Sequence, residues 1–155
     1  MAAPLSGTLT PIRWSVQPAQ VGNLAISIAR LDIGLYLRTV LPGRRVVPEQ
    51  SWLDTGAPLS VIPFHVHNKR LDWKPLPGGR VTWAGQPCDL GHIDLWLSTR
   101  QPPFFRGPLS LLAKFPRSDP PGQRVSVLLG LECILTLQAA LMLPPPPQPG
   151  HIQVP

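Results

Sequence analysis

The stretch Trp52-Leu53-Asp54-Thr55-Gly56-Ala57 decides the fold, because it runs an apolar strand end directly into Asp-Thr-Gly. The triplet provides, in order, a carboxylate at the end of a strand, a small hydroxyl residue and a glycine that lets a neighbouring segment approach closely. Later, Val127-Leu128-Leu129-Gly130 places apolar residues ahead of another glycine. Asp-x-Gly is also common in Asx-type turns, so the surroundings decide how the triplet is interpreted.

Apolar residues precede the triplet, and Ser60-Val61-Ile62-Pro63 follows it. Together with the later Leu-Leu-Gly, this arrangement resembles the retropepsin-like family of aspartic proteases, in the form found in cellular and bacterial relatives. The resemblance spans residues 24 to 143. It implies an all-β fold: a small closed, mostly antiparallel barrel of the acid-protease type with one short C-terminal helix.

The length of the chain sets how such a site is completed. A chain of 155 residues is ordinarily one domain. Pepsin-like enzymes carry two Asp-Thr/Ser-Gly loops in one chain, whereas this chain has one, so the resemblance implies a homodimer with the site on its two-fold axis. We expect an extended N-terminal arm over 1–20, the protease-like domain over 21–143 and a Pro-rich tail over 144–155.

Composition favours β structure and argues against a nucleic-acid partner. Proline is abundant, at 22 residues, and 14% of residues are charged, which argues against long helices and against a solvated disordered chain. The net charge of +6 reflects a scarcity of acids, since the basic residues are dispersed. Nucleic-acid binding prefers a basic stripe with interleaved aromatic residues, so we do not expect a nucleic-acid partner.

No segment of the sequence predicts a membrane or metal role. The first residues lack a basic region followed by an apolar one, and no apolar run is long enough to span a bilayer, so we expect a cytoplasmic protein without a membrane partner. Cys88 and Cys133 are compatible with a disulfide, but reduced, packed thiols are favoured. His65 and His67 share a face on a strand, yet without a third ligand nearby a surface pair is favoured. We expect no metal and no cofactor.

Periodicity predicts the elements along the chain. Apolar residues alternate with others over the first half, and Val125 to Leu129, apolar apart from Ser126, forms a strand ahead of Gly130. The expected elements are a possible strand at 12–16, strands over 24–28, 31–37, 46–53 and 60–64, a loop over 71–79, a strand or helical turn over 109–113 and a last strand over 136–143. The family resemblance adds a short helix over 131–135. Pro144 to Pro147 should then end all hydrogen-bonded structure.

A hairpin over 81–97 lies between the two motifs, where the family places its flap. A flap opens to admit a peptide and closes over it, so small residues suit its tip. The candidate flap and substrate-binding residues are Trp83, Ala84 and Gly85. An ordinary structural hairpin is the alternative.

The resemblance implies that Asp54 of two copies forms the catalytic pair. Two carboxylates within hydrogen-bonding distance share one proton near the working pH, because both cannot comfortably ionise. The ionised member activates a water while the protonated member polarises the scissile carbonyl. By the same resemblance, the active-site loop is supported by Thr55, Gly56, Ala57, Leu129 and Gly130.

Two positions depart from the viral pattern. The residue after Ala57 is usually Asp and the residue after the Leu-Leu-Gly glycine is usually Arg, but here they are Pro58 and Leu131. Both partners are missing together, so neither is left as an unpaired charge. The sequence predicts an aspartic endopeptidase; the alternative is a catalytically inactive dimerisation or peptide-binding module.

Overall fold

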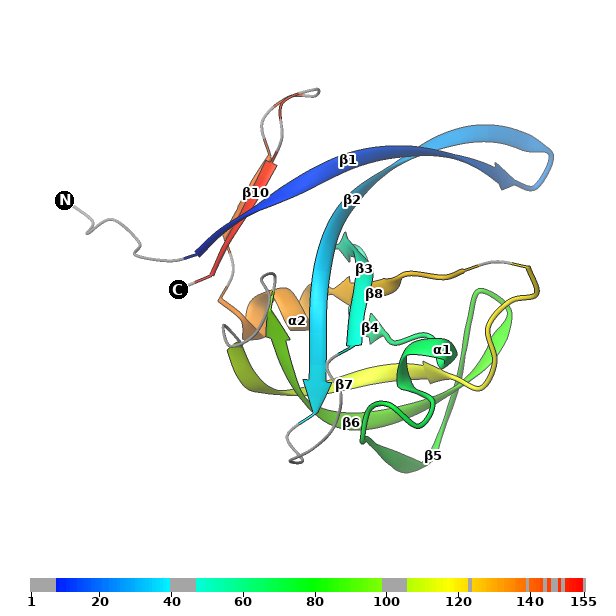
Figure 1. Cartoon of the computed structure of the whole chain (residues 1–155). Helices are drawn as coiled ribbons and strands as arrows, with labels where there is room; N and C mark the ends of the chain where they lie inside the picture. The colour runs from blue at the N-terminus through cyan, green and yellow to red at the C-terminus, as the bar shows by residue number, and fades with distance from the viewer. Residues whose placement is uncertain are drawn as a thin grey trace.

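Over the residues that the structure describes, the chain folds into strands that hydrogen-bond in a 10-stranded sheet, with two short helices (Figure 1). The computed structural model describes residues 8–39, 47–98, 106–122, 124–138, 140–143, 145, 148 and 150–154. The elements are β1 (Thr8–Val21), β2 (Leu24–Thr39), β3 (Val47–Asp54), β4 (Ser60–Val61), α1 (Phe64–His67), β5 (Lys74–Trp83), β6 (Gln86–Ser98), β7 (Arg106–Pro116), β8 (Val127–Gly130), α2 (Leu131–Thr136), β9 (Ala140–Met142) and β10 (Gly150–Val154).

The sheet closes on itself. Hydrogen-bonded neighbours run β6-β7-β4-β8-β3-β2, and β2 then pairs back onto β6. Most neighbours are antiparallel; β3 with β8 and β4 with β7 are parallel. The predicted all-β fold with a short helix after Gly130 is therefore confirmed. The single turn α1 was not predicted.

Side chains that alternate along the barrel strands fill its interior. On β3, Ser51 and Leu53 point inward and are buried, whereas Trp52 and Asp54 on the opposite face are half-buried. Burial of apolar side chains is the main force that holds such a barrel together. The largest fully buried ones include Phe115, Leu37, Ile62, Ile93, Leu95 and Leu111.

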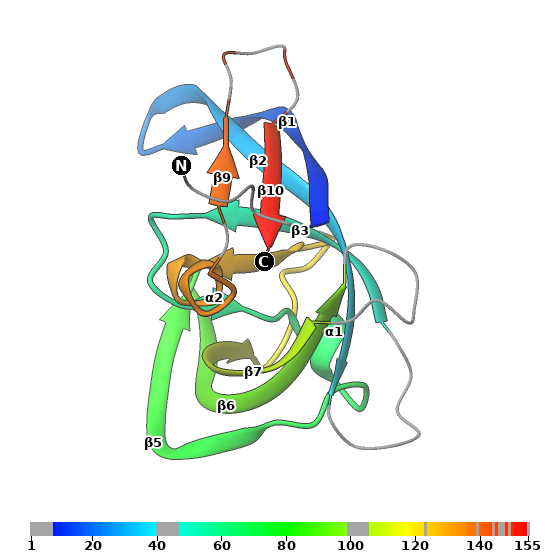
Figure 2. The same ribbon diagram turned by 90° about the vertical axis from the view of Figure 1, so that its left-hand side faces the viewer.

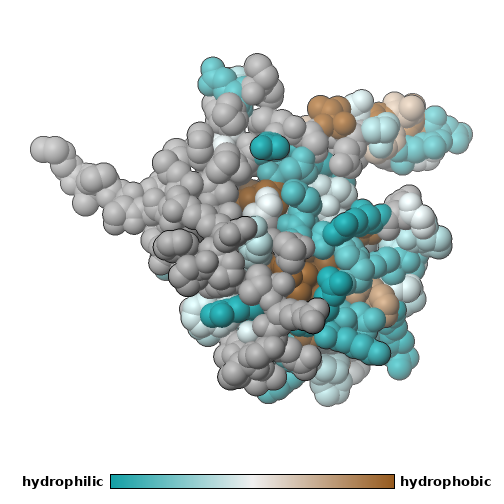
Figure 3. Space-filling model, viewed as in Figure 1, coloured by the Kyte–Doolittle hydropathy of each residue, from teal (hydrophilic) through white to brown (hydrophobic). Residues whose placement is uncertain are grey.

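The β1–β2 hairpin projects from the barrel. Its far end stands clear of the other strands in two perpendicular views (Figures 1 and 2). Hydrophobic surface lies on this hairpin (Figure 3), where Val16 and Leu24 are 70% and 68% exposed. The possible strand at 12–16 is thus part of a longer strand.

The prediction that hydrogen-bonded structure ends at Pro144 is wrong. Residues 150–154 form β10, which pairs with Thr8–Ile12 of β1 and with β9. The prolines lie before β10, so its own N–H groups remain free to donate, and a distant segment of the chain supplies the acceptors. The division into arm, domain and tail stays a prediction.

Two other boundaries differ from the predicted ones, and one open choice is resolved. The last strand was expected over 136–143, but α2 extends to Thr136 and the strand covers only β9. The loop over 71–79 is wrong from Lys74 onward, where β5 begins. The open choice at 109–113 resolves as the middle of strand β7.

The strand predicted over 60–64 ends at Val61, because the chain then turns into α1. The Phe64 and His65 N–H groups each donate to the Asp119 carboxylate at 2.9 Å. These are two of the N–H groups that a helix start leaves without internal acceptors. An acid from a distant segment therefore fixes this helical turn, which local periodicity does not reveal.

His67 lies in an aromatic cluster, so the expected surface pair with His65 is wrong. Its Nε2 lies 2.9 Å from the Pro116 carbonyl oxygen. Its ring makes edge contacts with Phe64, Trp73 and Phe115, at centroid distances of 5.4 to 5.6 Å. Burial lowers the pKa of His67 below its usual 6.5, against the opposing effects of the Pro116 hydrogen bond and of nearby carboxylates.

The protein is expected to lose stability in mild acid through His67. Because the folded-state pKa of His67 is lowered, its contribution is complete above pH 6.5 and is lost as the pH falls from there through the folded-state pKa. His67→Gln keeps a donor but cannot titrate, so its free energy of unfolding should change less with pH. Urea unfolding at pH 7.5 and pH 5.5 measures this. If the free energy of unfolding changed equally with pH in the wild type and in His67→Gln, the prediction would be contradicted.

Candidate active site

Asp54 is the last residue of β3, at the point where the barrel strand ends. The Gly56 N–H donates to Asp54 Oδ1 at 2.9 Å, and the Ala57 N–H donates to the Asp54 carbonyl oxygen at 3.2 Å. These bonds form a tight loop that holds the half-buried carboxylate. Thr55 and Gly56 are exposed beside it.

The first N–H groups of α2 hold this loop in place. The Leu131 N–H donates to the Ala57 carbonyl oxygen at 2.7 Å, and the Glu132 N–H donates to the Pro58 carbonyl oxygen at 3.2 Å. The first N–H groups of a helix have no acceptor within the helix, so they are available to the loop. The two positions that depart from the viral pattern, Pro58 and Leu131, thus each take part in this support through their backbone atoms.

Leu129 and Gly130 run alongside the strand that carries Asp54. In the parallel β3–β8 pair, Leu53 lies opposite Leu129 and Asp54 opposite Gly130. The Gly130 N–H donates to the buried Ser60 Oγ at 3.0 Å. The structure therefore brings the two sequence motifs together.

A side chain does not fit at Gly130. A Cβ atom there would lie 2.5 Å from the Leu59 carbonyl carbon and 2.8 Å from the Ala57 carbonyl oxygen. Real Cβ atoms essentially never approach backbone atoms so closely. Glycine at this position follows from the close approach of the two segments, not from an unusual φ.

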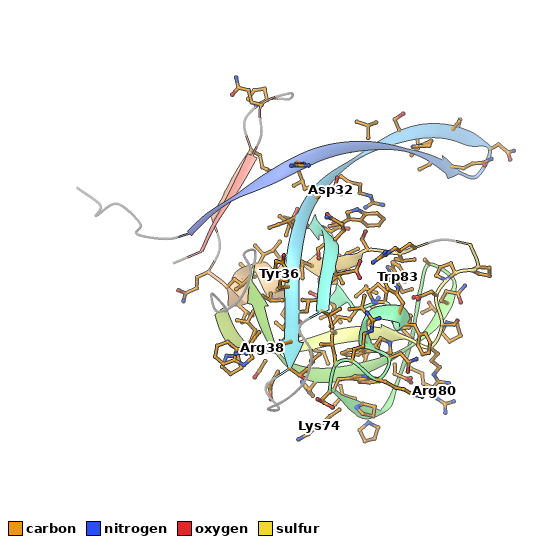
Figure 4. All side chains as sticks on the ribbon, in the orientation of Figure 1. Asp32, Tyr36, Arg38, Lys74, Arg80 and Trp83 are labelled. Atoms are coloured by element: carbon orange, nitrogen blue, oxygen red, sulfur yellow. The ribbon has the colours of Figure 1, made fainter. Side chains whose placement is uncertain are left out.

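Trp83, Ala84 and Gly85 form the end of a separate hairpin. Trp83 pairs with Gln86, and the two residues between them have φ values of 47° and 74°. Two left-handed residues in a two-residue loop are typical of a type I′ turn. Trp83 is half-buried while the turn is exposed; Trp83 is labelled in Figure 4. The structure confirms the hairpin and places its turn at the predicted tip.

The two cysteines are free and buried. Burial raises the pKa of Cys133 to about 12, an effect to which the nearby Glu132 charge adds. Burial also raises the pKa of Cys88. A thiol is nucleophilic only as thiolate, so neither group supplies a nucleophile near neutral pH. The favoured reading as packed, reduced thiols is confirmed.

Two features that involve β3 residues were missed from the sequence. The Arg30 guanidinium lies 4.7 Å from the centroid of the Trp52 ring, two residues before Asp54. On β3, Glu49 is buried, and its carboxylate lies 3.4 Å from His65 Nε2 and 3.3 Å from Arg124. His65 Nδ1 in turn lies 2.9 Å from Asp119. These partners are far apart in sequence, so no spacing signals them.

Within the described ranges, no three His, Cys, Asp or Glu side chains gather as a metal ion would require. Among the same residues, no helix is both long and apolar enough to cross a membrane. The chemistry that the loop offers is that of a carboxylate held at the end of a strand.

Comparisons with known proteins give structural similarity without a match in sequence. No family model matches the chain, and no curated protein matches it. Among solved structures, the chain is similar to the EIAV protease complexed with the inhibitor HBY-793, with a TM-score of 0.47 and 16% sequence identity. The match covers 74% of this chain and 93% of that one.

Proposed function

We propose that the protein is an aspartic endopeptidase of the retropepsin-like type, which hydrolyses peptide bonds as a homodimer through Asp54 of each copy. The observation that carries this proposal is the Asp54 loop. Its carboxylate sits half-buried at a strand end, and backbone hydrogen bonds join its loop to the segment that begins at Gly130. The residues that make up this arrangement are those on which the sequence resemblance rests.

One copy supplies one carboxylate, whereas the chemistry needs two in different protonation states. A second Asp54 within hydrogen-bonding distance makes the pair share a proton, because two adjacent negative charges repel. The ionised carboxylate takes a proton from water, which attacks the peptide carbonyl. The protonated carboxylate polarises that carbonyl and then supplies the proton that the leaving nitrogen needs. This chemistry uses protein carboxylates and water.

The loop residues have separate roles in this proposal. Thr55 hydrogen-bonds across the dimer and fixes the two loops relative to each other; its exposure leaves the hydroxyl accessible to a partner. Gly56 presents its backbone carbonyl to the substrate. Ala57 holds the loop through the bonds that its backbone makes to Asp54 and to α2.

The β5–β6 hairpin is proposed to act as the flap. Its exposed turn at Ala84 and Gly85 contains two left-handed residues, and Trp83 beside it carries a large ring suited to covering a bound peptide. Closure over the substrate excludes water from the reacting atoms.

A peptide library together with a statine-type inhibitor tests the proposal. Such inhibitors mimic the tetrahedral intermediate and draw on the same carboxylate pair, so one should block cleavage. It should also slow hydrogen exchange at residues 82–88 if the flap closes over it. Cleavage with unchanged exchange would remove the flap assignment alone. Absence of cleavage at every pH between 3 and 8 would contradict the proposed enzyme.

The second candidate is an inactive peptide-binding or dimerisation module. The observation that favours it is the loss of the charged pair at Pro58 and Leu131, where Leu131 is 38% exposed. Such a module would bind peptides and the inhibitor without cleaving any peptide. Binding in the absence of cleavage therefore separates the two functions.

A further inference from the structure

Among the described residues, the outer part of the β1–β2 hairpin has no neighbouring strand. Within that part of the chain, residues 13–21 pair only with β2, because β10 pairs with residues 8–12. On the other side, β3 pairs with β2 from Leu31 onward, so residues 24–30 are left with β1 alone. An isolated two-stranded ribbon is marginally stable in water and needs packing on a face. We call residues 13–30 the arm.

Exposed apolar side chains lie on both faces of the arm. Leu24 is 68% exposed and Ile26 is 39% exposed. Because these two residues are two positions apart on strand β2, their side chains lie on one face. Val16 lies opposite Ala29 on the other face and is 70% exposed.

The face that carries Leu24 and Ile26 continues onto the barrel beside Asp54. Leu31 packs against the core, so the even-numbered neighbours Arg30 and Asp32 lie on the outer face of β2. Figure 4 labels Asp32 where the arm meets the barrel, and the register places it opposite Trp52. Because Trp52 and Asp54 are two apart on β3, both belong to this same twisted face.

The Arg30 contact ties the arm to this face. Its guanidinium stacks over the Trp52 ring at 4.7 Å. Its Nε atom is buried without a hydrogen-bond partner among the described residues. The outer face therefore runs from the apolar tip of the arm, past Arg30 and Trp52, to the Asp54 loop.

We infer that a second copy of the chain covers this face and that the arm of each subunit packs against the other subunit. The inference rests on the proposed function, which requires two Asp54 carboxylates to meet. Any copy whose Asp54 reaches this one lies against the face that Asp54 shares with Leu24 and Ile26. The arm then buries its apolar side chains on the partner.

The charges on the face suit a two-fold contact. Arg30 and Asp32 carry opposite charges two residues apart, and in an isologous interface each meets the same surface of the other subunit. Two such stretches can therefore face each other with opposite charges opposed. Val16 lies on the other face and takes no part in this contact.

The test compares substitutions on the two faces of the arm. The double variant L24D/I26D places charges on the proposed interface, while Val16→Asp places one on the opposite face as the matched control. Sedimentation equilibrium should give a dimer Kd at least about tenfold higher for L24D/I26D, and an unchanged Kd for the control. Circular dichroism at the same concentrations reports whether each variant is folded. If L24D/I26D is unfolded, the double variant with Leu24→Ser and Ile26→Ser replaces it.

The outcomes separate this inference from the proposed function. An unchanged Kd in the Leu24 and Ile26 variants, or an equal rise in the Val16 control, would overturn the arm contact. If those variants stay dimeric but show a raised KM, the face holds substrate instead and the inference is wrong. Dimers that still cleave peptides leave the enzyme proposal standing, whereas a wild-type protein that is monomeric and inactive overturns both.

Discussion

Replacement of Asp54 by asparagine is expected to lower kcat for peptide hydrolysis by at least about a hundredfold. The amide cannot take up a proton from water, so neither member of the proposed pair can act as the base. The fold should persist, because the amide has nearly the same shape and its oxygen can still accept the Gly56 N–H. Initial rates on a fluorogenic peptide and urea unfolding measure the two effects.

Asp94→Asn is the matched control for the Asp54 substitution. Asp94 is exposed on β6, and its carboxylate accepts a hydrogen bond from Ser110 at 2.6 Å. The same chemical change there should leave the rate unaltered. Equal rates for wild type and the Asp54 variant would mean that the chemistry takes place elsewhere.

Gly130→Ala is expected to destabilise the protein by about 1–3 kcal/mol. The added Cβ would meet backbone atoms of Leu59 and Ala57 at 2.5 to 2.8 Å, and backbone cannot rotate aside as a flexible side chain can. The strands or the loop must separate, which weakens the bonds that hold the Asp54 loop. Urea unfolding gives the loss in free energy, and peptide cleavage at low temperature shows whether the loop is displaced.

Gly34→Ala is the control for that substitution. Gly34 also lies in a strand of the barrel, but an added Cβ would meet only the end of the Gln50 side chain, at 3.9 Å. Its stability should therefore stay close to that of the wild type. A loss at Gly34 as large as the loss at Gly130 would show that alanine disturbs these strands generally.

The sequence predicts the centre of the molecule well because local signals determine it. Apolar runs that end in Asp-Thr-Gly and in Leu-Leu-Gly correspond to β3 and β8, and the segment after Gly130 is helical as expected. The helix was implied by the family resemblance, whereas the two strands are specified by residues within a few positions of one another. The turn at Ala84 and Gly85 is predicted for the same reason.

Features that depend on distant partners were not predictable. β10 forms because residues 150–154 find acceptors on the first strand, and nothing near the proline run indicates this. α1 begins where Asp119 accepts two N–H groups from across the chain. The burial of Glu49 likewise depends on His65 and Arg124, whose positions only the closed barrel establishes.

The backbone hydrogen bonds from α2 to the Asp54 loop affect the conditions under which the site stays assembled. In the viral pattern, a charged pair occupies the positions of Pro58 and Leu131. Attraction between partly exposed charges weakens as ionic strength rises. Here the loop is held by amide-to-carbonyl hydrogen bonds from Leu131 and Glu132, which carry no net charge. The geometry of the loop should therefore be insensitive to salt, and the Leu131 side chain, which is 38% exposed, is free to vary so long as the backbone bonds form.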